Sequence, residues 1–268
     1  MAEAGRRVAI EARGMSVGYG GRAVVADLDL SIPEGAFTAI IGPNGSGKST
    51  LLRALAGLLP LSKGSLHIRG HSVANMSRKA LARQLSFLPQ SPQAPEGLTP
   101  LHLVRQGRYP HRSMLRSWSE EDEECCTHAL LVTGLSKLKD RPLETLSGGQ
   151  RQRAWIAMTL AQRAGILLLD EPTAFLDIAH QIDVLELLVG FVRNQETTTV
   201  AIIHDINQAV RYADHVILLK DGMLFAQGAP PEAITESTIA KVFHVKANKS
   251  TDPVHGVPFF VPYSLERP

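Results

Sequence analysis

Cysteine, long apolar runs and one-sided charge are all scarce in this sequence. Its only cysteines, Cys125 and Cys126, are adjacent within the helical pattern "SEEDEECCTHALLVTG". Neighbouring side chains of a helix point apart, which suits neither a metal site nor an ordinary disulfide, so we expect two free, inert thiols. No apolar stretch approaches the roughly 18 residues of a membrane span, and the start "MAEAGRRVAI" lacks the apolar segment of a signal peptide. We therefore expect a cytoplasmic protein.

The charge balance excludes further classes of partner. Among 268 residues, 28 Lys and Arg stand against 26 Asp and Glu, a formal net charge of +2, and neither sign forms a long block. The chain has neither the basic arm expected of a nucleic-acid-binding protein nor an acidic tail, so we expect no nucleic-acid partner. With 44% hydrophobic and 20% charged residues, the composition is that of a globular protein with a substantial core.

Short apolar runs alternate with helical patterns, which predicts an α/β layer with a partly parallel sheet. The runs "FTAIIG", "GILLLD" and "TTVAIIH" are apolar almost throughout, as expected of strands covered by helices on both faces. In such sheets ligands bind at the carboxyl ends of the strands, so the polar residues that follow these runs should share one site. "SKG" at residues 62–64 and "DG" at residues 221–222 predict the tips of two hairpins. From about residue 91 to 146 helical periodicity replaces the strand pattern, which predicts an inserted helical subdomain.

The stretch "GPNGSGKST" fits the G-x-x-x-x-G-K-[ST] pattern of a phosphate-binding loop and lies between a strand pattern and a helical pattern. Glycines allow the backbone amides to curl around the β- and γ-phosphates, Lys48 reaches between these phosphates, and the Ser49 hydroxyl binds Mg²⁺. The candidate nucleotide-binding residues here are Gly42, Pro43, Asn44, Gly45, Ser46, Gly47, Lys48, Ser49 and Thr50.

Two carboxylates, Asp170 and Glu171, follow the apolar run "ILLL". We expect Asp170 to hold the Mg²⁺ shell and Glu171 to orient and partly deprotonate the attacking water. Taken alone, the pair fits the cap of a helix equally well. Beside a phosphate-binding loop, the catalytic interpretation is favoured.

Two single polar residues, Gln90 and His204, also follow apolar runs. A lone glutamine or histidine is more often simply polar than functional. Both runs are expected in the same sheet, however, so both side chains should approach the γ-phosphate and the metal. Asp205, next to His204, is expected to cap the following helix.

A second glycine-containing stretch, "LSGGQRQR" at residues 146–153, opens a helical pattern but contains no lysine to neutralise a phosphate. A helix N-terminus with exposed amides and the Ser147 hydroxyl suits a phosphate that another site already holds. The stretch therefore raises the question of which phosphate it contacts.

These motifs, together with "FLD" at Phe175, occur in the order and at the spacing of a known family. From about Val8 to about Phe243 the chain resembles the ATP-binding subunits of ABC transporters. The resemblance implies an ABC-type ATPase with a RecA-like nucleotide-binding core, an antiparallel β subdomain and an inserted α-helical subdomain. It places the ATP-binding domain at residues 1–243, with the helical subdomain at about 91–158, and leaves a C-terminal tail at 244–268.

The resemblance also implies roles for single residues. Tyr19 matches the aromatic residue that stacks on adenine, although a tyrosine in a glycine-rich turn is often only a packing residue. Gln90 matches the residue that links Mg²⁺ and the γ-phosphate to the helical subdomain, and His204 the residue that senses the γ-phosphate. In this family two chains form a head-to-tail homodimer around two ATP molecules, so "LSGGQ" meets the partner's nucleotide. The residues implied on that side are Ser147, Gly148, Gly149, Gln150 and Asp177.

Two stretches that ATP chemistry does not require give a narrower resemblance. "LVRQGRYPHRS" and "FLDIAHQIDVLELL" resemble the ATPases of bacterial ferric-siderophore importers, within the group that also takes up haem and cobalamin. The implied protein is peripheral to the cytoplasmic face of the inner membrane. It powers separate permease subunits and is served indirectly by a periplasmic or surface substrate-binding protein. The alternatives are import of haem or cobalamin, and a soluble ABC ATPase such as a cluster-assembly factor. We expect Tyr109 and His111 near the permease.

Overall fold

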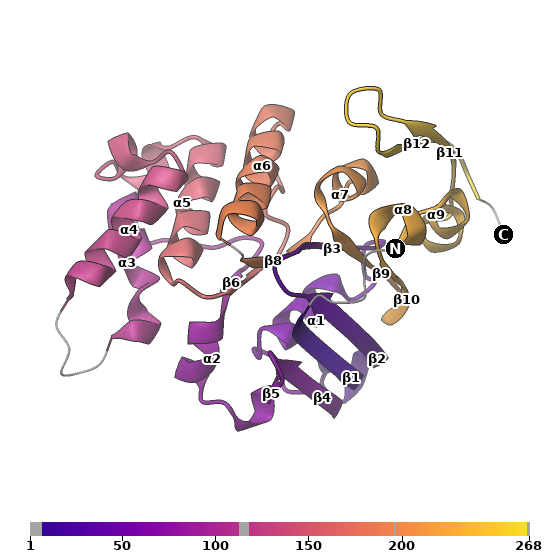
Figure 1. Ribbon diagram of the computed structural model, residues 1–268, viewed down its shortest axis with the longest axis horizontal. Coiled ribbons are helices and arrows are strands. Elements are labelled where there is room, and N and C mark those ends of the chain that lie inside the picture. Colours follow the sequence, from indigo (N-terminus) through magenta and orange to yellow (C-terminus); the bar gives the residue numbers. More distant parts are fainter. Residues whose placement is uncertain (1–6, 113–117, 196, 267–268) are drawn as a thin grey trace.

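The computed structural model describes residues 7–112, 118–195 and 197–266. The first six and last two residues of the chain, and Ser113 at the end of "LVRQGRYPHRS", lie outside this range. A six-stranded sheet crosses the middle of the described structure, with an antiparallel sheet below it and a helical lobe to one side (Figure 1). Two further helices and a small hairpin follow at the C-terminal end.

The central sheet contains the three buried runs expected from the sequence. Its strand order is β10-β9-β3-β8-β7-β6, and all neighbours are parallel except β9 and β10. The strands are β3 (Phe37–Ile41), β6 (Leu85–Leu88), β7 (Ile166–Leu169), β8 (Thr198–Ile202), β9 (His215–Lys220) and β10 (Met223–Gly228). The "DG" turn joins β9 to β10 as predicted, with φ of 49° at Asp221 and 76° at Gly222, a conformation that favours such turn residues.

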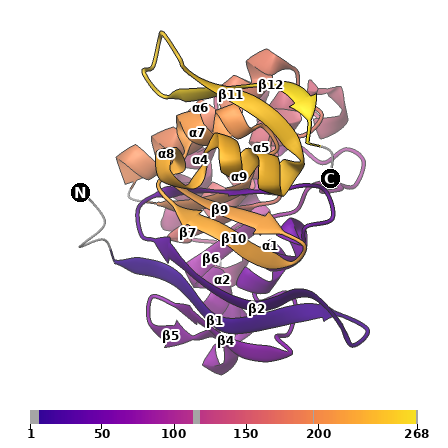
Figure 2. The same ribbon diagram turned by 90° about the vertical axis from the view of Figure 1, so that its right-hand side faces the viewer.

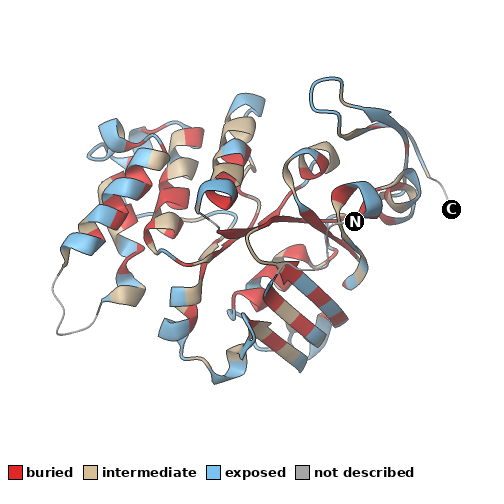
Figure 3. Ribbon diagram, viewed as in Figure 1, coloured by how far each residue is buried: buried red, intermediate tan, exposed pale blue. Residues whose placement is uncertain are grey.

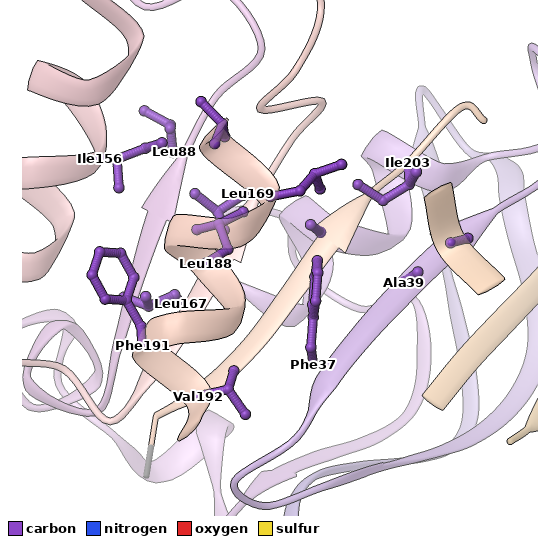
Figure 4. Close-up of a cluster of buried hydrophobic side chains, with 14 of the residues drawn as sticks. Phe37, Ala39, Leu88, Ile156, Leu167, Leu169, Leu188, Phe191, Val192 and Ile203 are labelled. Carbon is purple, nitrogen blue, oxygen red and sulfur yellow. The ribbon is translucent and has the colours of Figure 1, made fainter. Parts of the chain in front are cut away.

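Alternate residues of the central strands face two separate hydrophobic cores, and strands β3, β7 and β8 are buried along their whole length (Figure 3). Phe37 and Ala39 belong to one core, together with the helical lobe and α6 (Ile178–Gln195), as Figure 4 shows. Ile40 belongs to the other core, with α1 (Lys48–Leu55) and the antiparallel sheet. Helices on one face and a second sheet on the other explain why these strands are apolar at nearly every position.

The antiparallel sheet has the strand order β2-β1-β4-β5. Its strands are β1 (Val8–Tyr19), β2 (Arg22–Pro33), β4 (Lys63–Ile68) and β5 (His71–Ser72). The prediction of a hairpin tip at residues 62–64 was wrong, because Lys63 begins β4, which pairs with the distant β1. A Cβ on Gly64 would lie 2.4 Å from the carbonyl oxygens of Arg13 and Gly14, so this glycine permits close approach to β1 instead of making a turn.

The helical lobe lies between β6 and β7, and the described residues of this segment form no strand. Its helices are α3 (Pro100–Gln106), η2 (Tyr109–His111), α4 (Glu120–Val132), η3 (Ser136–Leu138), η4 (Leu143–Thr145) and α5 (Gly148–Ala161). Arg108, only 1% exposed, donates to Asp122 at 2.8 Å and to the Ala161 carbonyl at 3.0 Å, which ties α4 to α5. Cys125 and Cys126 are buried free thiols, as expected.

The C-terminal segment forms a hairpin that no pattern in its proline-rich sequence predicts. It follows α8 (Pro230–Ala233) and α9 (Glu236–Phe243) and pairs β11 (Val245–Thr251) with β12 (Pro258–Leu265). The Asn207 side chain of α7 (Ile206–Tyr212) donates to the Phe260 carbonyl at 3.1 Å and accepts from the Phe260 amide at 2.8 Å. These bonds hold the hairpin on the opposite side of the core from the antiparallel sheet (Figure 2).

Two short helices, η1 (Val73–Asn75) and α2 (Arg78–Gln84), lead from the antiparallel sheet to β6. Within the described ranges, no helix has the length and apolar character needed to cross a bilayer.

Candidate active site

The loop between β3 and α1 has a backbone that requires glycine. Gly42, Gly45 and Gly47 have φ of 154°, 80° and 96°, which side-chain-bearing residues rarely adopt. A Cβ on Gly42 would also lie 2.3 Å from the Leu219 carbonyl oxygen of β9. The predicted phosphate loop is therefore a tight turn at the carboxyl end of a buried strand, directly before the N-terminus of a helix.

Lys48 lies inside this loop and is 6% exposed. Its Nζ donates to the carbonyl oxygens of Gly42 and Pro43, both at 2.9 Å. Burial lowers the pKa of Lys48, and the nearby carboxylates of Glu171 and Asp170 act against that shift. The ammonium group therefore lies at the turn where a phosphate would bind, and among the described residues it bonds only to neutral oxygens that an anion can replace.

Asp170 is a buried carboxylate at the end of β7 that is only half satisfied. Its Oδ1 accepts from the Ser49 hydroxyl at 2.9 Å, whereas no described residue donates to Oδ2. Burial raises the pKa of Asp170, and the bond from Ser49 opposes this effect. A buried carboxylate oxygen with no partner is costly unless a cation neutralises it.

These donors fit a magnesium ion. Carboxylate and hydroxyl oxygens are ligands that Mg²⁺ accepts, and this ion usually keeps several waters and takes the rest of its shell from substrate phosphates. The described residues contain no group of three or more His, Cys, Asp and Glu side chains suited to a metal. Ser49 and Asp170 therefore suit a metal that arrives with a nucleotide better than one held by protein ligands alone.

Glu171, Gln90 and His204 are brought together from the ends of three strands. The Glu171 carboxylate accepts from Gln90 Nε2 at 2.5 Å through Oε2, and Oε1 lies 2.8 Å from His204 Nε2. Glu171 has φ of 52°, a strained conformation for a residue with a side chain and one that is frequent at functional sites. Gln90 and His204 are themselves exposed, so both can contact a ligand above Glu171.

The residue after His204 behaves as predicted. Asp205 caps α7, and its Oδ1 accepts from the backbone amides of Asn207 and Gln208 at 2.7 and 3.2 Å. The cap fixes the start of α7 and with it the loop that carries His204.

Tyr19 stands apart from these residues, next to the turn between β1 and β2. It is 49% exposed. Val25 of β2 lies beside the phosphate loop, since a Cβ on Gly47 would be 3.0 Å from Val25 Cγ2. The hairpin that carries Tyr19 therefore flanks the loop, with the tyrosine ring open to solvent.

The stretch at residues 146–150, here called the signature stretch, opens α5 in the helical lobe, whereas the phosphate loop opens α1 beneath the central sheet (Figure 1). Ser147 Oγ accepts from the Gln150 amide at 3.2 Å, and Gln150 Oε1 accepts from the Ser147 amide at 3.1 Å. This reciprocal cap occupies the Gln150 side chain. Ser147 and Gly148 are exposed, while Gly149 is buried under the ring of His180.

The structure thus brings most predicted residues into two groups. The phosphate loop, Asp170, Glu171, Gln90 and His204 form the first, and the signature stretch lies with Asp177 in the second, joined through His180. No sequence motif assigns a role to His180, which lies within the stretch "FLDIAHQIDVLELL".

Of the two residues expected near a permease, Tyr109 is 77% exposed and His111 is partly buried. His111 Nε2 lies 2.7 Å from the Gln162 carbonyl oxygen, so its ring supports the lobe from within. Burial lowers the pKa of His111. Only Tyr109 of this pair presents a free side chain to a partner.

Comparisons with known proteins agree with this geometry. Residues 25–174 match the family model described as ABC transporter. The petrobactin import ATP-binding protein FpuD of Bacillus anthracis is 47% identical over 259 residues, which covers 97% of this chain and 95% of FpuD. The ferric enterobactin transport ATP-binding protein FepC of Escherichia coli (strain K12) is 47% identical over 254 residues, which covers 95% of this chain and 94% of FepC.

Solved structures agree as well. An inward-facing putative metal-chelate type ABC transporter superposes with a TM-score of 0.83 at 28% identity, covering 96% of this chain and 98% of that chain. A dimeric bacterial ABC transporter cassette, MJ0796, superposes with a TM-score of 0.72 at 28% identity, covering 82% of this chain and 98% of that chain. These matches confirm the expected fold class. This chain belongs to the ABC transporter family, among its ATP-binding subunits.

Proposed function

We propose that this chain binds ATP with Mg²⁺ and hydrolyses it to power the import of a ferric siderophore through separate permease subunits. The observation that carries the chemical part is the convergence of Gln90 and His204 on Glu171, next to the Ser49–Asp170 pair. Such a group at the end of a phosphate loop has the composition of a phosphoryl-transfer site, where positioning and charge stabilisation supply most of the catalysis.

Each residue has a physical role in this proposal. Lys48 and the amides of the phosphate loop bind the β- and γ-phosphates. Ser49, Asp170 and Gln90 would hold the magnesium ion, which when bound would neutralise charge on those phosphates. Glu171 accepts a proton from the water that attacks the γ-phosphorus, while the bond to the β-phosphate breaks and ADP leaves. His204 and Gln90 orient the Glu171 carboxylate before the nucleotide arrives.

The second group of residues serves a second copy of the chain. We propose a head-to-tail homodimer in which Ser147, Gly148 and Gly149 approach the γ-phosphate held by the partner. The N-terminus of α5, where Ser147 and Gly148 are exposed, suits an anion, and the absence of a lysine is then explained by Lys48 of the partner subunit. Asp177, whose side chain is 67% exposed, lies on the same edge and would cross the interface.

The cargo is inferred from relatives. The names of those at 43–47% identity include petrobactin, achromobactin, ferric enterobactin and iron(3+)-hydroxamate. Cobalamin import proteins of Halobacterium salinarum are 36% identical, and this chain covers only 62% of their length. The balance favours a ferric siderophore, with cobalamin or haem as the second candidate.

The proposed import function implies a location and partners for the chain. Import through a permease places this subunit at the cytoplasmic face of the inner membrane, bound to permease subunits and served by a periplasmic or surface substrate-binding protein. Tyr109 on the exposed side of the helical lobe is the residue we propose closest to the permease.

Uptake by cells that lack the gene tests the cargo. The expected result is loss of uptake of a labelled ferric siderophore, restored by the wild-type gene, with growth on abundant simple iron unchanged. Normal siderophore uptake with loss of cobalamin or haem uptake would reject a siderophore as the cargo and leave the import function standing. Purification of the tagged chain from membranes should recover a permease, and recovery of a soluble partner in its place would contradict import altogether.

A further inference from the structure

The stretch "DIAHQ", residues 177–181, is not accounted for by nucleotide chemistry. In the structure its histidine, His180, packs against the start of α5. A Cβ built on Gly149 would fall 2.0 Å from His180 Cδ2 and 2.7 Å from Cγ, so the imidazole ring lies directly on the backbone of Gly149. This glycine of the signature stretch is thus covered by a side chain of its own protein.

His180 also bonds to the loop before α6. Its backbone amide donates to Asp177 Oδ1 at 2.9 Å, and its ring Nδ1 donates to the same oxygen at 2.7 Å. These two bonds, the backbone one foremost, lower the pKa of Asp177. One side chain therefore contacts both segments that the proposed dimer presents to its partner.

Neighbouring contacts extend this connection between α5 and α6. Leu176 Cδ2 lies 3.7 Å from the position of a Cβ on Gly148, on the other side of the signature glycines. Farther along both helices, Arg153 forms an ion pair with Asp183. The signature stretch and the Asp177 loop are therefore in contact at successive positions.

The residue after His180 connects the same loop to a third element. Gln181 Nε2 donates to the Leu176 carbonyl at 2.9 Å, and Gln208 of α7 donates to Gln181 Oε1 at 2.8 Å. The Asp177 loop is thus held to α7 independently of His180. Loss of the His180 ring would remove the contact that covers Gly149 and weaken the link between the signature stretch and the Asp177 loop, while the loop stays attached to α7.

On the basis of the dimer proposed above, we propose that His180 is a positioning residue for the nucleotide held by the partner subunit. It fixes the signature stretch of its own chain against its own Asp177 loop, so both segments meet the partner's nucleotide as one unit. A segment fixed before association loses less conformational freedom when the dimer closes, which favours closure. In this arrangement Gly149 is a glycine because the His180 ring occupies the space of a side chain.

The test uses a dimer with one working site. One chain carries Ser147→Arg and supplies the intact phosphate loop, and the other carries Lys48→Ala and supplies the intact signature stretch. His180→Phe, which keeps a ring but removes the bond to Asp177, is placed in either chain. The concentration of a non-hydrolysable ATP analogue that gives half-maximal closure is then measured.

In the chain that supplies the signature stretch, His180→Phe should raise that concentration about tenfold, the usual effect of losing one hydrogen bond to a charged group. In the other chain the change should stay below about twofold, within the scatter of surface substitutions. His180→Asn, whose amide can replace Nδ1, should recover at least half of the loss on a logarithmic scale. Glu186→Gln, an exposed change farther along α6, is the matched control and should have no effect.

The outcomes distinguish failure of the proposed role of His180 from failure of the proposed dimer. Equal effects in both chains, no effect in either chain, or failure of His180→Asn to improve on His180→Phe would overturn the role of His180. If the parent dimer, with His180 intact in both chains, does not close, the proposed dimer itself is wrong. Thermal unfolding of each variant chain should fall by no more than about 4 °C from that of its parent, the shift expected in a chain of this size for the loss of one partly exposed contact. A larger drop would assign His180 to folding and reject the positioning role.

Discussion

The two groups of residues in the proposed site differ in how completely a single chain builds them. On the phosphate side, Lys48 and Asp170 are 6% and 1% exposed, and their partners come from the same chain. On the signature side, Phe175 and Ile178 are 91% and 75% exposed around Asp177. Large apolar side chains left this open mark a surface that a partner covers. One half is therefore preorganised within the chain, and the other is the half that the proposed second copy would cover.

This difference suits a site that must bind ATP before the dimer closes. In the proposed site the buried half would provide affinity for ATP and a fixed orientation for the attacking water, because its groups need little rearrangement. The open half would provide a contact that exists only in the proposed closed dimer, and a ligand that binds this state more tightly shifts the population toward it. Substitutions on the two sides should consequently fail in different ways.

The largest effect is expected for Glu171→Gln. The variant keeps the bonds that shape the site but loses the base, so kcat should fall by roughly 10²–10⁴-fold while ATP still binds. ATP hydrolysis and nucleotide affinity measured on the same preparation provide the check. The variant should accumulate as a nucleotide-bound dimer on size-exclusion chromatography. Wild-type turnover would refute the role of Glu171, and loss of binding would make it structural.

The next largest effect is a loss of stability, expected when the Arg108–Asp122 pair of the helical lobe is broken. Burial would raise the pKa of Asp122, but hydrogen bonds from Arg108 and Ser119 outweigh it and lower the pKa to about 2. Asp122→Asn removes the carboxylate nearest to the buried Arg108 and leaves only the more distant Glu121 at 3.8 Å, which should reduce the free energy of unfolding by about 3 kcal/mol. Urea unfolding at neutral pH measures this difference.

The pH dependence of the same pair has a definite sign. A carboxyl group whose pKa is lowered by folding stabilises the protein fully above its ordinary value of 3.8 and loses that contribution as the pH falls toward about 2. The difference in the free energy of unfolding between wild type and Asp122→Asn should therefore be constant above about pH 5 and decrease below it. An increase of this difference at acidic pH would contradict an ionised Asp122 beside Arg108.

Lys48→Ala tests the buried half directly. In the proposed site the ammonium group faces the β- and γ-phosphates, so ATP affinity should fall about 30-fold, the range for a charge-assisted bond, while AMP affinity changes by less than about threefold. Isothermal titration with the two nucleotides gives both numbers. Equal losses would place the lysine elsewhere in the site.

Tyr19→Ala should have the smallest effect. Loss of one stacking contact lowers ATP affinity by about fivefold, and affinity for inorganic tripolyphosphate, which has no base, should not change. Competition between these two ligands measures the difference. A loss for both would show that Tyr19 supports the phosphate loop instead of stacking on adenine.

Local sequence patterns predicted the parts of this fold in which neighbours along the chain decide the structure. The three buried runs became parallel strands, and Asp205 became the cap of α7, because a strand's apolar pattern and a cap's hydrogen bonds are both local. The same holds for the phosphate loop, whose glycines and lysine act within a few residues of each other.

The errors arose where distant contacts decide. Gly64 looked like a turn residue, and only the backbone of β1 shows why it is small. Pro258 and Pro262 made β12 hard to predict, since proline argues against a strand. Both prolines are tolerated because each strand of this hairpin has a single partner. The contact of His180 with Gly149 joins residues on separate helices, and no spacing rule predicts it.

The burial of the two native thiols has a practical consequence for spectroscopy. Cys125 and Cys126 are 6% and 0% exposed, and burial raises the pKa of Cys126 to about 12. Alkylating reagents attack thiolates that solvent reaches, so the folded chain should remain unlabelled by maleimide dyes. A single cysteine introduced at Val254, 79% exposed between β11 and β12, would then accept a fluorophore selectively. Energy transfer between two such dyes would follow the approach of two chains without removing either native cysteine.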